Sequence, residues 1–459
     1  MNSILQLKGR FEQRSNRSRP GSPKLPKGKS VSASHLRELE KQLERILVYW
    51  TENKDIRGAL VSVHYKHIVA KSNRLKILLS ENGKSPTESI RGAKFVWEPD
   101  QKGNEVQKHV FTHFVSLQAI EKSIDVLKKT ASIIEQYYKG SVPSEVIEEL
   151  GEKYHFNEVP KTSFLKTVVD GFYVERFDID RATEEITEEA IITIYQTGVD
   201  TKRLLSKFGI DIVDDRIIDG TTLRLNPDEV KLLYNNASYL IAMGVTDFSE
   251  ISRDDVLDAY EDMEEDAGLL IPHPQNEPVI GVIDTQFNEK VYFHEWVEYK
   301  NLLDPNIPLS RKDYEHGTAV SYIIVDGPQG NPELADGCGR FRVRHFGVAT
   351  NNGFSSFTVL KMIRNIVASN RDIKVWNLSL GSKLEIKPNF ISPEAAELDR
   401  IQSEYDVIFV VAGTNIPAGV TKKNMRIGSP ADSLNSMVVN AVDFAGNSAS
   451  YTRIGPVLS

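Results

Sequence analysis

Five short, nearly continuous apolar runs alternate with helix-like stretches between residue 279 and residue 442 of this 459-residue chain. Apolar runs of strand length are typical of strands that are buried on both faces of a parallel sheet. The runs are residues 279–283, 342–348, 373–378, 407–411 and 437–442, and the helical stretches between them are 316–325, 356–369 and 393–404. The alternation predicts an α/β fold with a doubly wound, mostly parallel sheet, whose functional site lies at the carboxyl ends of the strands.

The chain before residue 268 predicts one or two small α+β domains. Apolar residues at three- and four-residue spacing from Leu36 to Trp50 indicate an amphipathic helix. We expect strands at 59–69, 109–115, 172–179, 209–213 and 221–225, and helices at 116–129, at 184–197 and after Asn226-Pro227. The predicted domains are a disordered basic arm (1–31), an N-terminal α+β domain (32–140), a second helical or α+β region with an acidic connector (141–267), and the α/β domain (268–459).

The acidic connector gives the clearest boundary. Residues 247–266 contain ten acids and one base, Arg253, which indicates a solvated and helical connector. Pro272, Pro274 and Pro278 then disfavour helix immediately before the first apolar run.

Composition favours a cytoplasmic protein. A single cysteine, Cys338, cannot form an internal disulfide. Residues 1–30 carry eight Lys or Arg and one acid, without an apolar run of signal-peptide length, and no run is long enough to span a membrane. The net charge of −8 makes nucleic-acid binding by the whole surface unlikely, although the basic arm could contact nucleic acid or an acidic partner.

Two residues at the start of the α/β region suggest acid–base chemistry. Asp284 ends the first apolar run, and His316 follows 32 residues later in the triplet His316-Gly317-Thr318. A buried aspartate can accept the N–H of a histidine, fix its tautomer and stabilise the imidazolium that forms in catalysis. Taken singly, the aspartate could instead close a strand-to-loop turn and the histidine could cap a helix.

Two later segments, residues 376–381 and 410–415, complete the pattern. With these motifs, residues 279–459 resemble the catalytic domain of the subtilases, the S8 serine peptidases. The resemblance implies that Asp284 and His316 are the triad aspartate and general base. It also implies that Ser379, Leu380 and Gly381 lie on the strand that pairs with the substrate backbone, and that Ala412 and Gly413 form the opposite wall of the cleft.

The oxyanion position departs from the family pattern. Thr414 stands where subtilases usually have asparagine, and Asn415 comes one residue later. The loss of one oxyanion donor costs roughly 10² to 10³ in rate. We expect Asn415 to serve after a local rearrangement, with Thr414 as a weaker hydroxyl donor and a simple turn before Pro417 as the alternative.

The serine box of the family, Gly-Thr-Ser-x-Ala, does not occur in these 459 residues. Without its nucleophile a triad keeps only residual catalysis, so the sequence predicts that this chain is inactive alone. We expect a chain truncated before the serine of a subtilisin-like endopeptidase. The alternative is a pseudopeptidase that binds a peptide or acts as a regulatory module.

The same sequence features predict the cofactors and partners. No cofactor or metal is expected; His109 and His113 are four residues apart but are interpreted as a surface pair. The expected partner is a polypeptide substrate. The layout before residue 270 is similar to extensions of bacterial subtilases encoded beside AAA-type ATPases in anti-phage loci, which implies a possible AAA-type ATPase partner. That region could also be an inhibitory propeptide with a cleavable acidic link.

Overall fold

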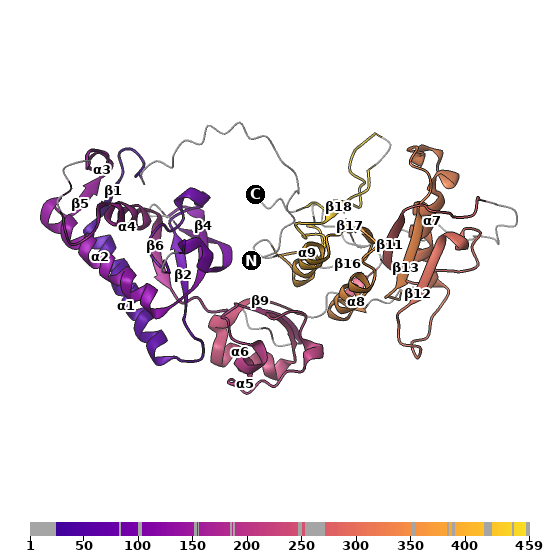
Figure 1. Ribbon diagram of the computed structural model, residues 1–459, viewed down its shortest axis with the longest axis horizontal. Coiled ribbons are helices and arrows are strands. Elements are labelled where there is room, and N and C mark those ends of the chain that lie inside the picture. Colours follow the sequence, from indigo (N-terminus) through magenta and orange to yellow (C-terminus); the bar gives the residue numbers. More distant parts are fainter. Residues whose placement is uncertain are drawn as a thin grey trace. The chain divides into compact units, whose positions relative to one another are not determined.

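The computed structural model describes residues 24–455, apart from 82–83, 100–102, 151–153, 155, 184–185, 187–188, 247–249, 253–270, 351–353, 383–384, 388–390, 417–424 and 443–444. Most of the basic arm and of the acidic connector therefore lies outside the described residues. The chain divides into two compact units, with the boundary between Gly244 and Val245 (Figure 1).

The first unit contains a four-stranded antiparallel sheet with the strand order β3-β4-β2-β6. Its elements are β1 (Ser30–Ser32), α1 (Ala33–Glu52), β2 (Ala59–Tyr65), β3 (Ile90–Pro99), β4 (Glu105–Val115), α2 (Leu117–Tyr137), β5 (Ser141–Pro143), α3 (Ser144–Glu149), α4 (Lys161–Tyr173) and β6 (Val174–Asp178). The predicted amphipathic helix is α1. Its start is fixed by the Ser32 side chain, which accepts from the His35 amide, and its buried face packs against α2 (Figure 1).

Strand β6 pairs with β2, so the first sheet continues beyond the domain boundary expected at residue 140. A separate three-stranded sheet follows in the order β8-β7-β9. The elements of this part are β7 (Ala190–Ile194), α5 (Thr201–Ser206), β8 (Thr222–Leu225), α6 (Pro227–Ala237) and β9 (Ile241–Thr246).

Two expectations for this part are wrong. The helix predicted at 184–197 is replaced by β7, because the run Ile191-Ile192-Thr193-Ile194 is β-branched and fits a buried strand better than a helix. The strand predicted at 209–213 is a turn and loop, which begins with Gly209 at a φ of +78°. The helix opened by Asn226-Pro227 is confirmed as α6, with a capping box between Asn226 and Glu229.

The second unit confirms the α/β fold with a six-stranded parallel sheet of order β12-β13-β11-β15-β17-β18. Its elements are β10 (Glu250–Ser252), β11 (Val279–Asp284), β12 (Val297–Asn301), α7 (Lys312–Gly330), β13 (Arg342–Gly347), β14 (Phe354–Ser355), α8 (Ser356–Ser369), β15 (Val375–Leu378), β16 (Gly381–Ser382), α9 (Pro393–Tyr405), β17 (Ile408–Ala412) and β18 (Met437–Val439). Helix α7 packs on β11 and β13, whereas α8 and α9 pack on each other (Figure 1).

Close packing at the centre of this sheet depends on one glycine. Gly281 of β11 lies opposite Trp376 of β15, and a Cβ atom at position 281 would come within 2.2 Å of the buried indole ring. The glycine therefore lets the strand that ends in Asp284 pass beside a large aromatic side chain.

Candidate functional site

Asp284 lies where β11 ends, at the carboxyl edge of the parallel sheet. Its side chain is fully buried, and its Oδ1 atom accepts hydrogen bonds from His316 Nδ1 at 2.6 Å and from the Thr285 amide at 2.6 Å. The Thr285 hydroxyl lies 3.2 Å from the same oxygen, whereas Oδ2 is buried without a hydrogen-bond partner among the described residues. One carboxylate oxygen thus anchors the imidazole and the first turn of the following loop.

The electrostatics of this pair favour an ionised aspartate. Burial alone would raise the pKa of Asp284, but the charge of the neighbouring His316 and the hydrogen bonds to Oδ1 hold that pKa below its ordinary value. An ionised carboxylate can stabilise positive charge on the imidazole that donates to it, so the arrangement suits a histidine that accepts a proton during a reaction.

His316 lies on α7, which begins at Lys312. The expectation that His316 opens the helix is wrong by one turn, because Asp313 Oδ2 accepts from the Ser310 amide at 2.6 Å and helps to start the helix earlier. The side chain of His316 is 9% exposed, so it is buried but not completely.

The residue after His316 must be glycine for steric reasons. A Cβ atom at Gly317 would lie 2.6 Å from the Gln286 carbonyl oxygen and 2.8 Å from that of Thr285. The Gly317 amide donates to the Thr285 hydroxyl at 3.0 Å. The His-Gly-Thr triplet therefore allows α7 to approach the loop after Asp284 closely enough for the Asp–His hydrogen bond.

The residues expected to bind substrate follow β15 and β17, which are neighbours in the sheet and continue outward from β11. Leu380 is buried and Gly381 begins the short strand β16, while Ala412 ends β17. A Cβ atom at Gly381 would lie 2.4 Å from Thr414 Cγ2, and one at Gly413 would lie 1.9 Å from Asn440 Oδ1. The two predicted cleft walls therefore meet between Gly381 and Thr414.

A segment of the connector pairs with one of these walls. Strand β10 lies between β14 and β16 in a three-stranded antiparallel sheet. Ile251 pairs with Phe354 and with Ser382, and Ser252 pairs with Gly381. The strand expected to pair with a substrate backbone is thus paired with residues of the same chain.

The predicted oxyanion residues lie in the turn after β17. Thr414 has a φ of +66°, a conformation that asparagine adopts more readily than a β-branched residue, and its hydroxyl accepts from the Gly428 amide at 2.9 Å. Asn415 forms an isolated antiparallel bridge with Thr452, and its carbonyl oxygen accepts from Arg453 Nε at 2.7 Å. The side chain of Thr414 and the backbone of Asn415 are therefore held by contacts with other parts of the domain.

His345 was not predicted as part of the site. Its ring nitrogens contact Ser321 and Thr285, which are 24 and 60 residues away in the chain. The one sequence feature that could have indicated it is a histidine within an apolar run. His113, expected on the surface, is instead 1% exposed and bound to Ser89, because β4 is an inner strand of its sheet.

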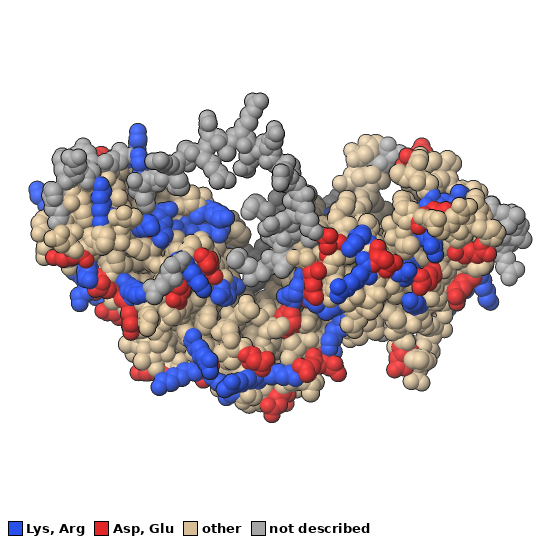
Figure 2. Space-filling view, in the orientation of Figure 1, with Lys and Arg blue, Asp and Glu red and all other residues tan. Residues whose placement is uncertain are grey.

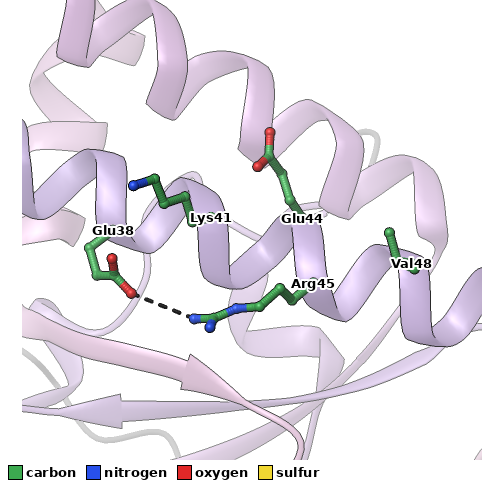
Figure 3. A pocket seen from close by; sticks show the side chains of 5 residues that line it. All are labelled: Glu38, Lys41, Glu44, Arg45 and Val48. Carbon is green, nitrogen blue, oxygen red and sulfur yellow. Dashed lines mark ion pairs between the residues drawn. The ribbon is translucent and has the colours of Figure 1, made fainter.

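A second His–Asp contact lies in the first unit, where His64 Nε2 is 2.8 Å from Asp180 Oδ1. A shallow hollow on α1 is lined by residues of that single helix, with Glu38 and the mostly exposed Arg45 3.5 Å apart (Figure 3). On the face shown in Figure 2, basic and acidic side chains are interspersed. Among the described residues, no group of three or more His, Cys, Asp or Glu side chains could hold a metal ion. No described helix is long and apolar enough to cross a membrane.

A buried Asp–His pair at the carboxyl edge of a parallel sheet is an arrangement from which an acid–base site can be built. Residues 275–459, less than half of the chain, match the family model of the subtilases, peptidase family S8. No curated protein matches the chain.

Solved structures of proteases align over part of the chain. They include the prenylagaramide maturation protease PagA (16% identity, 39% of this chain and 58% of that chain, TM-score 0.29). The epidermin leader peptide processing serine protease EpiP from Staphylococcus aureus aligns with 17% identity over 59% of this chain and 74% of its own, with a TM-score of 0.33. The subtilisin-like protease Apa1 from Pseudoalteromonas sp. AS-11 aligns with 18% identity over 39% of each chain, with a TM-score of 0.29. The alignment with PagA thus spans less than two thirds of that protein.

Proposed function

We propose that residues 275–459 provide the aspartate and histidine of a subtilisin-like serine endopeptidase site. The hydrogen bond of 2.6 Å between Asp284 Oδ1 and His316 Nδ1 carries this proposal. Asp284 fixes the tautomer of His316, which leaves Nε2 to take the proton of a serine hydroxyl and later to return it to the leaving amine. The negative charge of Asp284 stabilises the imidazolium between these two steps.

A polypeptide substrate binds in this proposal as an extended strand between β14 and β16, along Ser379, Leu380 and Gly381, with Ala412 and Gly413 on the other wall. The pairing of β10 with both strands supports this mode, because the same backbone groups would bind any extended peptide. It also fits the alternative that the region before residue 270 is an inhibitory propeptide with a cleavable acidic link, since β10, which lies in that link, pairs with both strands.

Asn415 is the proposed oxyanion donor, with Thr414 as the alternative. The hydroxyl of Thr414 accepts a hydrogen bond from Gly428, which uses one of its lone pairs but leaves its proton available. The two assignments are separated by substituting each residue, as described in the Discussion.

A serine-reactive fluorophosphonate probe tests the function directly. We expect an in-frame Gly-Thr-Ser-x-Ala box beyond codon 459, and labelling of that longer protein that is abolished by His316→Ala. A matched His294→Ala variant, at a histidine that binds its own turn, should label like the parent. Unchanged labelling of the His316→Ala protein would refute the proposed role, and labelling of the 459-residue chain would refute its predicted inactivity.

Peptide binding without hydrolysis is the second candidate, because β10 shows that β14 and β16 can hold a strand without any chemical step. A longer protein that resists the probe but binds extended peptides would favour this pseudopeptidase function. The same measurement therefore separates the two candidates.

The more specific assignments remain predictions. An anti-phage role, an AAA-type ATPase partner and a cytoplasmic location rest on the layout and composition of the sequence. In this proposal, loss of Asp284 in the longer protein abolishes protection of bacteria in a phage-plating assay, and the ATPase co-purifies with the protein. Equal plating with Asp284→Asn would contradict a protective role that depends on proteolysis.

A further inference from the structure

His345 lies on β13, opposite Val282 of the neighbouring strand β11. Its side chain is fully buried and packs against the rings of Phe287 and Tyr299, with ring centroids 5.7 Å and 5.8 Å away. Its Nε2 atom lies 2.8 Å from the carbonyl oxygen of Thr285, and its Nδ1 atom lies 2.9 Å from Ser321 Oγ. Both ring nitrogens therefore have polar partners inside an otherwise aromatic environment.

The partners determine the tautomer of this ring. A carbonyl oxygen can only accept, so Nε2 must carry the proton that is donated to Thr285. In the neutral ring Nδ1 then accepts, and Ser321 donates its hydroxyl proton. Burial lowers the pKa of His345, which keeps the ring neutral and prevents it from competing with His316 for the charge of Asp284.

The two partners belong to the two elements that carry the Asp–His pair. Thr285 is adjacent to Asp284, to which it donates both its amide and its hydroxyl proton. Ser321 is fully buried on α7, the helix that carries His316. His345 thus connects the loop after β11 to α7 through its contacts with Thr285 and Ser321. The hydrogen bond from the Gly317 amide to the Thr285 hydroxyl connects the same loop and helix at a second point.

We propose that His345 is a positioning residue, which holds the Thr285 peptide so that Asp284 and His316 stay in hydrogen-bonding geometry. This inference rests on the proposed function of the same pair. The hydrogen bond between His345 Nε2 and Thr285 provides this positioning, and the hydrogen bond to Ser321 orients the ring.

Two substitutions separate these bonds. The amide nitrogen of glutamine can take the place of Nε2, so His345→Gln keeps a donor for Thr285 and loses the contact with Ser321. Asparagine is shorter and reaches only as far as Nδ1, so His345→Asn keeps a partner for Ser321 and loses the donor to Thr285. Both variants remove the ring, so their difference reports on which hydrogen bond matters.

The readout is the NMR signal of His316 in the 459-residue chain, labelled with ¹⁵N at its ten histidines. A low-field Nδ1–H resonance of His316 depends on the hydrogen bond to Asp284. We expect His345→Asn to abolish this low-field resonance. His345→Gln and Ser321→Ala should keep the resonance.

Controls separate positioning from general destabilisation. Val343→Ala removes buried methyl groups from the same strand, and we expect it to lower the thermal midpoint of unfolding without changing the His316 signal. Equal behaviour of the Asn and Gln variants, or a loss of the signal in Val343→Ala, would overturn the proposal. In the parent protein the ring of His345 must carry its proton on Nε2 at pH 7, and a proton on Nδ1 would overturn it even if His345→Asn fails to fold.

Asp284→Asn distinguishes a failure of this inference from a failure of the proposed site. If this change leaves the His316 signal unaltered, the Asp–His pair itself is wrong. If it removes the signal while His345→Asn retains it, only the role of His345 is refuted.

Discussion

Replacement of Gly281 by alanine tests whether the strand that carries Asp284 is packed as described. The new methyl group would lie 2.2 Å from Trp376 Cε3 and 2.5 Å from Cζ3, whereas favourable carbon contacts need about 3.5 Å. The indole cannot easily move away, because it is fully buried and stacks on Phe409 with centroids 6.3 Å apart. We expect Gly281→Ala to cost about 3 kcal/mol, the upper end for overpacking in a core.

Trp376→Phe should relieve this overlap, since it removes the ring atoms that the methyl group would meet. The indole Nε1–H is buried without a hydrogen-bond partner among the described residues, so the change loses only packing, at about 2 kcal/mol. If the two residues touch as described, the double variant should be more stable than the sum of the single changes by about 2 kcal/mol.

Urea unfolding followed by a short deuterium pulse measures these free energies in the α/β unit itself, through peptides that cover β11 and β17. Peptides that cover β2 and β4 provide an internal control, because the first unit should be unaffected. Strict additivity of the two substitutions would refute the close approach of Gly281 to Trp376.

Three further predictions concern the site and the first unit. In a protein that also carries the proposed serine box, Asp284→Asn should reduce fluorophosphonate labelling by roughly 10⁴, because the histidine loses its correct tautomer; a reduction below tenfold would contradict this role. Asn415→Ala should slow labelling by roughly 10² to 10³, whereas an effect confined to Thr414→Ala would assign the oxyanion to the threonine. Burial lowers the pKa of His113 from its ordinary 6.5 to about 3, so its stabilising effect is complete above pH 6.5 and is lost as the pH falls towards 3. At pH 4.5 this loss is about 3 kcal/mol, and His113→Asn should remove it from urea unfolding of β2 and β4; equal pH dependence of the two proteins would refute the linkage.

The parallel sheet could be predicted because its strands are buried on both faces and therefore appear as apolar runs. Strand β12 was not predicted because it lies at the edge of the sheet, where Glu298 and Lys300 interrupt its apolar pattern. Strand β7 was mistaken for a helix because helix-forming glutamates precede its β-branched core. The segment forms a strand because its side chains are buried in the sheet β8-β7-β9, and the local pattern does not contain this information.

The positions of Asp284 and His316 could also be predicted, since the ends of adjacent parallel elements meet at one edge of a sheet. The contacts that support them could not. His345 binds residues 24 and 60 positions away, and the role of a histidine in an apolar strand depends entirely on which donors and acceptors the fold brings to its ring. The positive φ of Thr414 was equally inaccessible, because threonine gives no local preference for that conformation.

The pairing of β10 with β14 and β16 has a kinetic and thermodynamic consequence for any incoming peptide. In the proposed binding mode, a peptide can pair with β14 and β16 only after β10 has left them. Because Ser252 and Val279 belong to one chain, β10 returns to these strands more readily than the same segment would from a separate molecule. Cutting the chain between β10 and β11 should therefore strengthen the binding of an added peptide.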